Sequence, residues 1–324
     1  MEPLRRRLLV PNHLSPSPVS IYAPASVGNI GPGFDTLGMA VTGMGDHISG
    51  YLDPALEADR IDGISGAWTP IPSSPEENTA SIAARFLLDR AGIKTPFRMT
   101  ISKGVPGSGL GSSAASAVGG AFFGHLLAGG RFSQPEILEA ALSAEAKVSG
   151  GIFLDNISAC LYGGVTVSHG ESRTSLPVGS LPGIHLIFVV PKSTLKTSEA
   201  RRILPDMVPR KDAVEALANT AGILAGIMRN DPDLFCLRVS DPLIEPYRKK
   251  LIPAFDSLKQ AALSSGATGF AISGAGSTTV ALTPREERIP FIRKSLQDVL
   301  VSKNIEAIIF LSTIDPKGVR VADS

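Results

Sequence analysis

The chain has 324 residues, more than one typical domain needs, which favours two subdomains. Hydrophobic residues make up 43% and charged residues 19%, which is typical of a soluble protein with a sizeable core. Lys and Arg together number 31, and Asp and Glu number 30. The near-balance excludes an overall field that attracts nucleic acid or an anionic membrane, so any anion must be bound locally.

The cysteines and the N-terminal residues indicate the cellular compartment. Cys160 and Cys236 have no paired metal-binding spacing, which argues against a disulfide framework or a zinc site and fits a reducing compartment. No apolar run reaches the ~18 residues that span a bilayer. Residues 1–18 contain Arg5 to Arg7 and several prolines but no long apolar segment. We expect a loose basic tail there in preference to a targeting segment, and a cytoplasmic protein.

The first half of the chain alternates strands, loops and helices. Val19 to Tyr22 reads as a strand, and residues 23–38 read as a shaped loop because glycines and prolines stand between apolar anchors. Asn29 and Asp35 are the polar candidates in this loop, although both residue types are common turn formers. The other elements expected here are strands at 40–41, 47–51, 97–102 and 165–168 and helices at 76–91, 114–128 and 134–148.

Val105 to Ser116 forms a glycine-rich loop between a strand and a helix. Gly107, Gly109 and Gly111 alternate, which lets the backbone approach a ligand closely. A loop that leads into a helix N-terminus is an anion site, because free N–H groups and the helix dipole favour negative charge. The serines Ser112 and Ser113 would cap the helix or offer a hydroxyl to a metal ion. A flexible turn without a ligand is the alternative.

Two further polar features stand out in this half. Asp155 and Asn156 lie inside the otherwise apolar run 149–164, and buried carboxylates are rare without a partner or a task. Glu145 lies near the end of an expected helix, where a glutamate is usually a solvated surface residue.

The second half contains a further set of elements. Residues 184–190 are nearly all apolar, as expected of a strand covered on both faces, and Thr197 is a plausible helix cap. A second glycine-rich turn lies within 266–280. Helices are expected at 211–229, 253–264 and 290–300 and a final strand at 306–311. We place the subdomain boundary near Gly170.

Several common nucleotide and metal motifs are missing. The sequence has no Gly-Lys-Ser/Thr P-loop, no Gly-x-Gly-x-x-Gly spacing, no protein-kinase catalytic motif and no His-Glu-x-x-His. Its five histidines are scattered singly. Any phosphate chemistry of this chain must therefore use a different sequence motif.

Taken together, the ordered motifs resemble the GHMP family of small-molecule kinases. The loop 106–116 is similar to that family's phosphate motif, and 269–277 is similar to its C-terminal glycine motif. Further stretches resemble the homoserine kinase branch of the family. They are 25–38, Asp155-Asn156, 197–205, 245–248, 251–253 and 315–321. The resemblance covers the chain from Val19 to Val321.

The resemblance implies a fold and an activity. The fold is two-domain α+β, with a tail at 1–18, an ATP-binding domain at 19–170 and a C-terminal domain at 171–324. The first domain would contain a left-handed βαβ crossover, and the second would be a ferredoxin-like α/β sandwich. The implied reaction is ATP- and Mg²⁺-dependent phosphorylation of L-homoserine to O-phospho-L-homoserine in threonine biosynthesis, without nucleic-acid or membrane partners and compatible with a homodimer.

The resemblance also implies roles for individual residues. Asp155 and Asn156 would lie at the reacting hydroxyl, and Ser113 and Glu145 would hold Mg²⁺. Substrate would contact Asn29, Asp35, Asn156, Thr197, Arg201, Arg248 and Gly274; the arginines suit a carboxylate and Asp35, with Asn29, suits an ammonium group. ATP would contact Asn78, Pro106, Gly107, Ser108, Gly109, Leu110, Gly111, Ser112, Ser113, Ala114, Ala115 and Ser116.

The chain departs from the family pattern at two positions. Phe153 stands where these kinases commonly have a histidine, which removes one hydrogen-bond donor, and Ser277 replaces a usual proline. Two alternatives therefore stay open: a kinase of the same family that acts on another small alcohol, and a non-catalytic sensor of nucleotide and amino acid.

Overall fold

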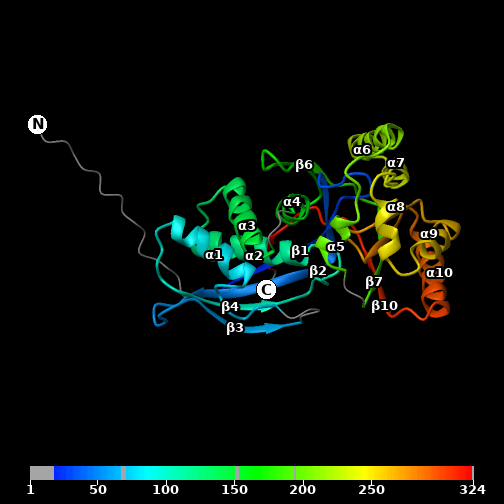
Figure 1. The fold of residues 1–324 in the computed structure, drawn as a ribbon. Helices are drawn as coiled ribbons and strands as arrows, with labels where there is room; N and C mark the ends of the chain where they lie inside the picture. The colour runs from blue at the N-terminus through cyan, green and yellow to red at the C-terminus, as the bar shows by residue number, and fades with distance from the viewer. Residues whose placement is uncertain (1–17, 67–70, 150–152, 193–194, 323–324) are drawn as a thin grey trace, which may run out of the picture.

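The computed structural model describes residues 18–66, 71–149, 153–192 and 195–322. It has two layered halves, each built from one β-sheet and the helices that cover it (Figure 1). This is the mixed α+β, two-domain architecture that the sequence predicts.

The first half is built on a seven-stranded sheet in which β11, β1, β2, β4 and β3 lie side by side, and β5 pairs with β2 and β6. Strands β3 and β4 are parallel, and helix α1 lies in the chain between them; the hand of this crossover stays a prediction. The strands are β1 (Val19–Gly28), β2 (Leu37–Leu52), β3 (Arg60–Ser65), β4 (Phe97–Ser102), β5 (Val165–His169), β6 (Thr174–Gly179) and β11 (Arg320–Val321).

Helices cover one face of this sheet (Figure 1). They are α1 (Thr79–Arg90), α2 (Ser112–Leu127), α3 (Gln134–Ser149) and α4 (Leu154–Tyr162). Small residues let α1 and α2 approach closely: a Cβ atom added at Gly120 would stand 2.0 Å from the carbonyl oxygen of Ala80. Close packing fixes α2, and with it the glycine loop that leads into α2.

The second half is built on the four-stranded antiparallel sheet β10-β7-β9-β8. When these four strands are numbered in chain order, they lie side by side in the order 4-1-3-2. This is the strand order of a ferredoxin-like βαββαβ unit, as predicted. The strands are β7 (His185–Pro191), β8 (Gly269–Ile272), β9 (Thr279–Thr283) and β10 (Ala307–Ser312). The helices are α5 (Thr197–Arg202), α6 (Arg210–Arg229), α7 (Pro232–Leu237), α8 (Glu245–Arg248), α9 (Phe255–Ser264) and α10 (Ile289–Ser302), with 3₁₀ turns at Lys249–Leu251 and Glu286–Arg288.

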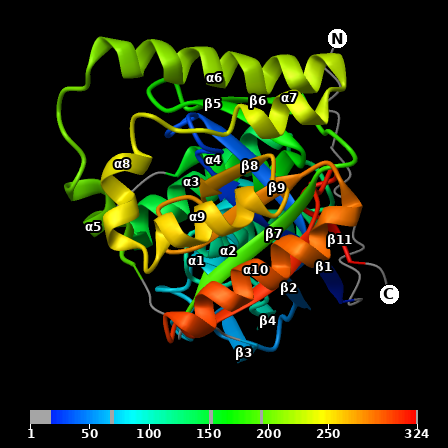
Figure 2. The same cartoon turned by 90° about the vertical axis from the view of Figure 1, so that its right-hand side faces the viewer.

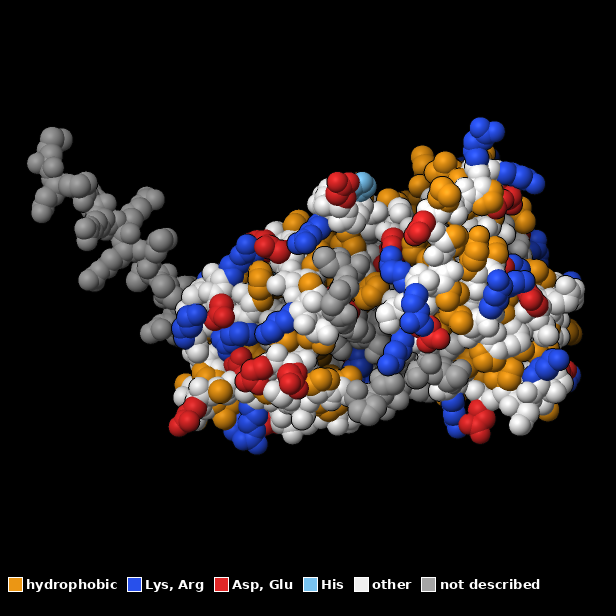
Figure 3. Space-filling model, viewed as in Figure 1, with side chains coloured by type: hydrophobic (Ala, Val, Ile, Leu, Met, Phe, Trp, Pro, Cys, Tyr) orange, Lys and Arg blue, Asp and Glu red, His pale blue; other side chains and the backbone are white. Residues whose placement is uncertain are grey.

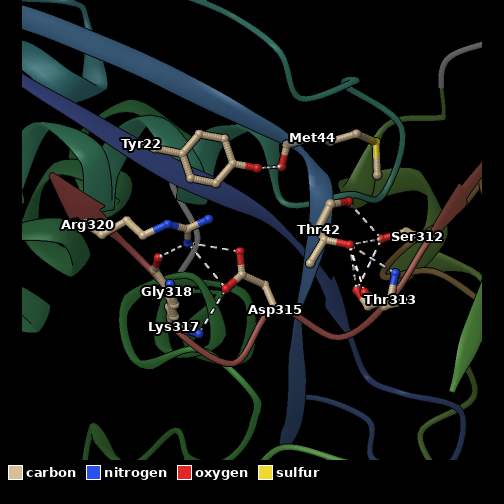
Figure 4. Close-up of polar contacts among 9 residues, drawn as sticks. All are labelled: Tyr22, Thr42, Met44, Ser312, Thr313, Asp315, Lys317, Gly318 and Arg320. Atoms are coloured by element: carbon tan, nitrogen blue, oxygen red, sulfur yellow. Dashed lines mark hydrogen bonds and ion pairs between the residues drawn. The ribbon is translucent and has the colours of Figure 1, made fainter. Parts of the chain in front are cut away.

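The C-terminal segment returns from the second sheet to the first (Figure 4). Ser312 Oγ donates a hydrogen bond of 2.7 Å to the carbonyl oxygen of Thr42 in β2. Buried Asp315 accepts from Arg320 at 2.9 Å, and the Arg320 guanidinium lies 4.6 Å from the ring centroid of Tyr22 in β1. Residues on both sides of position 170 thus contribute to the first sheet, and the domain limits given above stay predictions.

Strand β1 corrects the expected loop at 23–38. The strand runs on from Tyr22 to Gly28 although Pro24 lies within it, because the register with β2 shifts between Pro24 and Ala25. A bulge is one of the few places in a sheet that accept proline, which has no N–H to donate.

The predictions that a serine caps α2 and that Thr197 caps α5 were also wrong. Gly111, at a left-handed φ of 67°, precedes α2 without a side-chain cap, and Lys196 does so before α5. Ser112 Oγ instead donates to the carbonyl oxygen of Val105, and Ser113 Oγ donates to Glu145. The two serine hydroxyls therefore bind the loop and α3 and do not cap the helix.

Across the residues that the structure describes, we find no helix with both the length and the apolar character needed to cross a membrane.

Candidate active site

A cavity of about 1000 Å³ is lined by both halves of the molecule. Most of the predicted site residues line it: Asn29, Asp35, Asn78, Gly107, Gly109, Gly111, Ser112, Ser113, Ala114, Ser116, Glu145, Asp155, Asn156, Thr197, Arg201, Arg248 and Gly274. Pro106, Ser108, Leu110 and Ala115 are buried and are not among the lining residues. One cavity thus brings together residues that lie far apart in sequence.

The glycine loop is anchored from both halves. The carbonyl oxygen of Leu110 accepts from the N–H of Ser26 in β1 at 3.0 Å, and that of Gly109 accepts from Ser273 Oγ in the second glycine turn at 2.7 Å. Gly109 has a φ of 86°, and a Cβ atom there would stand 2.2 Å from the Ser273 carbonyl oxygen. Only glycine fits this contact, so the loop has a fixed shape in front of α2.

Ser113 and Glu145 form the pair expected to hold a metal ion. Ser113 Oγ donates to Glu145 Oε2 at 2.6 Å, both residues line the cavity, and Glu145 is only 1% exposed. A hydroxyl and a buried carboxylate beside a phosphate-type loop suit Mg²⁺, which prefers oxygen ligands and keeps several waters. Among the described residues no group of three or more His, Cys, Asp or Glu side chains could form a complete protein cage.

Lys103 is a site residue that sequence reasoning missed. It follows β4, lines the cavity and is 2% exposed. Its Nζ forms an ion pair with buried Asp46 and donates to the Ser112 carbonyl oxygen at 2.9 Å and to Ser116 Oγ at 3.0 Å. Burial raises the pKa of Asp46, and the Lys103 ammonium opposes that rise. The network therefore holds the start of α2 in place.

Asp155 lies at the start of α4 and is almost fully buried. Its Oδ2 accepts from the backbone N–H of Asn29 at 3.0 Å, and Asn156 Oδ1 accepts from Ser26 Oγ at 3.1 Å. Desolvation raises the pKa of Asp155 to about 6, against the hydrogen bonds it accepts and with a smaller contribution from the charge of Asp35. A cavity carboxylate with such a pKa is a candidate for proton chemistry.

The Gly274 carbonyl oxygen links the two halves at the cavity. It accepts from Asn29 Nδ2 at 2.7 Å and from Arg248 Nη1 at 3.1 Å. Arg248 Nε also donates to the Ala200 carbonyl oxygen at 3.1 Å. Burial and the neighbouring Arg201 lower the pKa of Arg248. The Gly274 carbonyl oxygen thus fixes Asn29 and Arg248, and all three residues were predicted to contact the substrate.

Arg201 binds Asp35 directly, although we expected the two to contact opposite ends of a substrate. Arg201 Nη1 and Nη2 donate to the two Asp35 carboxylate oxygens at 2.8 and 2.9 Å. The guanidinium groups of Arg201 and Arg248 lie 5.4 and 5.1 Å from the ring centroid of Phe34. Phe34 was also missed from the sequence, where its only signal is its place beside Asp35.

Three more of the singled-out residues line the cavity, and hydrogen bonds show a structural role for one of them. Asn78 caps α1, accepting from the N–H of Ala80 at 3.0 Å, and its Nδ2 donates to the Pro72 carbonyl oxygen at 2.7 Å. Its expected contact with adenine stays a prediction. Thr197 and Phe153 also line the cavity.

Family models match both halves of the chain. The model described as the GHMP kinases N terminal domain matches residues 78–164, and the GHMP kinases C terminal model matches 213–302. A homoserine kinase from Halorubrum lacusprofundi is 36% identical over 82% of this chain and 86% of its own length. One from Arabidopsis thaliana is 33% identical over 96% of this chain and 87% of its own.

Solved structures agree with these matches. The crystal structure of homoserine kinase from Cytophaga hutchinsonii superposes with a TM-score of 0.89, at 32% identity, over 99% of this chain and 100% of that chain. The L. major mevalonate kinase, at 16% identity and a TM-score of 0.71 over 91% of this chain and 95% of that chain, shares the fold. With both halves matched and identities above 30% over most of its length, the chain belongs to the GHMP kinase family.

Proposed function

We propose that the chain transfers the γ-phosphoryl group of ATP to the side-chain hydroxyl of L-homoserine, giving O-phospho-L-homoserine and ADP in threonine biosynthesis. The observation that carries the proposal is one cavity that joins a phosphate-type glycine loop to a cluster of opposite charges, Arg201, Arg248 and Asp35. The homoserine kinases named above support it through their identity over most of the chain.

The glycine loop and the start of α2 would bind the triphosphate. Backbone N–H groups at the α2 N-terminus, together with the helix dipole, favour anionic oxygens. Ser113 and Glu145 would hold Mg²⁺, which when bound neutralises charge that develops on the transferred group. Lys103 fixes the loop end of α2 through the Ser112 carbonyl oxygen.

The charged residues opposite the loop would bind the amino-acid end of homoserine. Its carboxylate suits Arg201 and Arg248, and its ammonium group suits Asp35. A zwitterion can separate the Arg201–Asp35 ion pair at little electrostatic cost, because it offers each partner a new opposite charge. Asn29, Thr197 and Gly274 would complete this subsite, since all three line the same cavity.

Asp155 and Asn156 would lie at the reacting hydroxyl. The hydroxyl oxygen forms the new bond to the γ-phosphorus while the bond from that phosphorus to the β–γ bridging oxygen breaks. The hydroxyl proton passes either to Asp155 or directly to a phosphate oxygen; a loose transition state allows both routes. Asp155 also fixes the loop before Asp35 through its bond to the Asn29 N–H.

The proposal includes a cytoplasmic enzyme that assembles as a homodimer. Another small alcohol stays open as the acceptor because Phe153 lines the cavity. A non-catalytic sensor fits less well, because Glu145, Asp155 and Ser113 are all in place.

A coupled ADP-release assay tests the function. We would compare homoserine, serine, threonine, mevalonate and galactose as acceptors, with Glu145→Gln as a control for contaminating kinases. We expect homoserine to give by far the largest kcat/KM, and ³¹P NMR to show a side-chain phosphomonoester. Turnover of mevalonate or galactose but not homoserine would reject the substrate, and no turnover of any alcohol would favour the sensor.

A further inference from the structure

Three segments of the first half meet at the side chain of Asn156. They are the end of β1 with Ser26 and Gly28, the glycine loop that ends at Gly111, and the start of α4. Ser26 Oγ donates to Asn156 Oδ1 at 3.1 Å. Asn156 lines the cavity, whereas Ser26 is 0% exposed and is not among the lining residues. Ser26 can therefore act on the cavity only through other residues.

This meeting point lies inside the molecule. Figure 3 shows basic side chains gathered over α5, at the surface beside the hollow between the two halves. Figure 2 looks onto the second half: α9 and α10 lie in front, and strands and helices of the first half lie behind them. Ser26 belongs to the covered strand β1, so bulk water does not compete for its hydroxyl.

Two glycines leave the room that the contact needs. A Cβ atom added at Gly111, which has a φ of 67°, would stand 2.2 Å from Ser26 Oγ and 3.0 Å from Asn156 Oδ1. One added at Gly28 would stand 2.4 Å from Asn156 Nδ2 and 2.5 Å from Asp155 Oδ2. An amide packed between two glycine backbones has little freedom to move. The Ser26–Asn156 hydrogen bond thus lies between the glycine loop and the carboxylate of Asp155.

The neighbours of the Asn156 amide fix which way round it lies. Ser26 donates to its Oδ1, and its Nδ2 donates to Asp155 Oδ1 at 3.4 Å. The reversed amide would set its oxygen against the carboxylate, which only accepts hydrogen bonds when it is ionised. Among the described residues, Nδ2 forms no further hydrogen bond, so one of its two hydrogens is left for an oxygen of a bound substrate.

We propose that Ser26 is a positioning residue for phosphoryl transfer, which holds the Asn156 amide with its NH₂ group towards the reacting oxygens. The inference rests on the proposed function and adds to it a residue that touches neither substrate. The N–H of Ser26 also donates to the Leu110 carbonyl oxygen of the glycine loop at 3.0 Å. One residue of β1 therefore sets the Asn156 amide and the loop that would bind ATP relative to each other, and such alignment is what phosphoryl transfer demands of a protein.

Steady-state kinetics of Ser26→Ala test the role. Without the hydroxyl, the amide loses the contact that fixes its oxygen and can rotate. We expect kcat to fall roughly 10- to 100-fold, because small errors of alignment cost that much. Both KM values should change less than about 3-fold, because Ser26 contacts neither substrate. Wild-type kcat in Ser26→Ala would overturn the inference.

Ser158→Ala is the matched control. Ser158 lies on α4, is 0% exposed, and its Oγ accepts from Ser168 Oγ at 3.3 Å, but it does not line the cavity. Its loss removes one buried hydroxyl, as Ser26→Ala does. We expect kcat of Ser158→Ala to stay within about 2-fold of the wild type, since its hydrogen bond does not reach the reacting groups. An equal fall in both variants would mean that any buried hydroxyl matters and would overturn the inference.

The Asn156→Ala background shows whether Ser26 acts through Asn156. Asn156→Ala alone should be poorly active, and adding Ser26→Ala should lower kcat by less than about 2-fold more, because the amide to be positioned is already gone. If Ser26 only shapes the glycine loop, its loss would lower kcat equally in both backgrounds, which would contradict the proposed role.

NMR of the full chain labelled with ¹⁵N-asparagine gives a readout that does not depend on turnover. The side-chain amide signal that disappears in Asn156→Ala belongs to Asn156. This signal should shift in Ser26→Ala and stay in place in Ser158→Ala; an unshifted signal in Ser26→Ala would reject the positioning of the amide. Failure of the proposed function would appear separately, as a wild type that does not turn over homoserine although the Asn156 signal shifts in Ser26→Ala.

Discussion

Arg201 and Asp35 lie 166 residues apart in the sequence and bind each other through two hydrogen bonds of 2.8 and 2.9 Å. The pair joins α5 of the second half to the loop that follows β1 in the first half. Both side chains are about half exposed, at 47% and 46%. An exposed pair contributes little to stability, so its residues are free to serve a charged ligand.

Replacing Arg201 by Ala should raise KM for homoserine far more than KM for ATP. A charged hydrogen bond to a carboxylate is worth about 1.5–3 kcal/mol, so the expected effect is roughly 10- to 150-fold. Steady-state kinetics with each substrate varied in turn measure it, and Arg248→Ala should act in the same direction. The neighbouring exposed Arg202 is the matched control. Equal changes in both KM values would indicate general damage and reject the assignment.

Phe34 should act as a positioning residue for the arginines. Both guanidinium groups lie within 5.4 Å of its ring centroid, and such contacts are worth about 0.5–1 kcal/mol each at partly exposed sites. Phe34→Leu should therefore raise KM for homoserine roughly 5- to 30-fold with a smaller effect on kcat. Phe34→Tyr keeps the ring face and should stay near wild type. A Tyr variant as poor as the Leu variant would mean that the ring acts by packing alone.

Glu145→Gln should lower kcat at least about 100-fold while the protein stays folded, because the carboxylate that would hold Mg²⁺ is lost and the side-chain size is kept. Titration of activity with Mg²⁺ should show a weaker apparent affinity. Glu139→Gln, on the exposed side of the same helix, is the control. Near-wild-type turnover with the same Mg²⁺ dependence would remove Glu145 from the site.

Asp155 should impose an acidic limb on the reaction. Its pKa is raised to about 6, so protonation should lower kcat/KM as the pH falls below about 6. Asp155→Asn should be much less active, and its residual activity should not show this limb. An unchanged limb in the Asn variant would assign the titration to another group.

The same carboxylate should cost stability at neutral pH. The folded state holds the Asp155 proton more tightly than the unfolded state, so the free energy of unfolding falls as the pH rises from about 4 to about 6. A shift from 3.8 to about 6 corresponds to roughly 2–3 kcal/mol. Asp155→Asn should therefore raise the free energy of unfolding at pH 7 and lose that advantage near pH 4. Urea titrations at both pH values measure this, and a destabilised Asn variant at pH 7 would contradict the desolvation argument.

Residues within contiguous motifs were the predictable part of this molecule. The glycine loop and Asp155 could be placed in a common site because each stands inside an uncommon local pattern and their order resembles that of a known family. Phe34 and Lys103 carry no such pattern. Phe34 gains its role from Arg201 and Arg248, which the second half supplies, and Lys103 gains its role from Asp46 on a neighbouring strand. Contacts of that kind arise only from tertiary packing.

Local rules also failed where tertiary contacts competed with them. Ser112 or Ser113 was expected to cap α2, yet Gly111 occupies the N-cap position and the Ser113 hydroxyl donates to Glu145 of α3. The first strand was expected to end at Tyr22, because glycines and prolines follow it, but a register shift accommodates Pro24 within β1. In both places, contacts between segments that are distant in the sequence determine the local structure.

Phe153 tests how closely the amino-acid subsite follows the family pattern. It lines the cavity two residues before Asp155 and is partly buried. A benzyl ring there supplies no hydrogen bond, whereas Arg201, Arg248, Asp35 and Asn29 still supply the charged and polar groups that a zwitterion needs. We therefore expect a pocket that has lost one polar contact without being reshaped for an uncharged alcohol.

Phe153→His should for this reason improve kcat/KM for homoserine. The gain should not exceed one neutral hydrogen bond, about 0.5–1.5 kcal/mol or roughly 2- to 12-fold. We would measure kcat/KM of the wild type and of Phe153→His on homoserine and on its decarboxylated analogue. The comparison separates a lost polar contact from a reshaped pocket, because the analogue lacks the group that the arginines would bind. Loss of homoserine activity in the His variant, or a native preference for the analogue, would show that the ring has reshaped the pocket for a less polar acceptor.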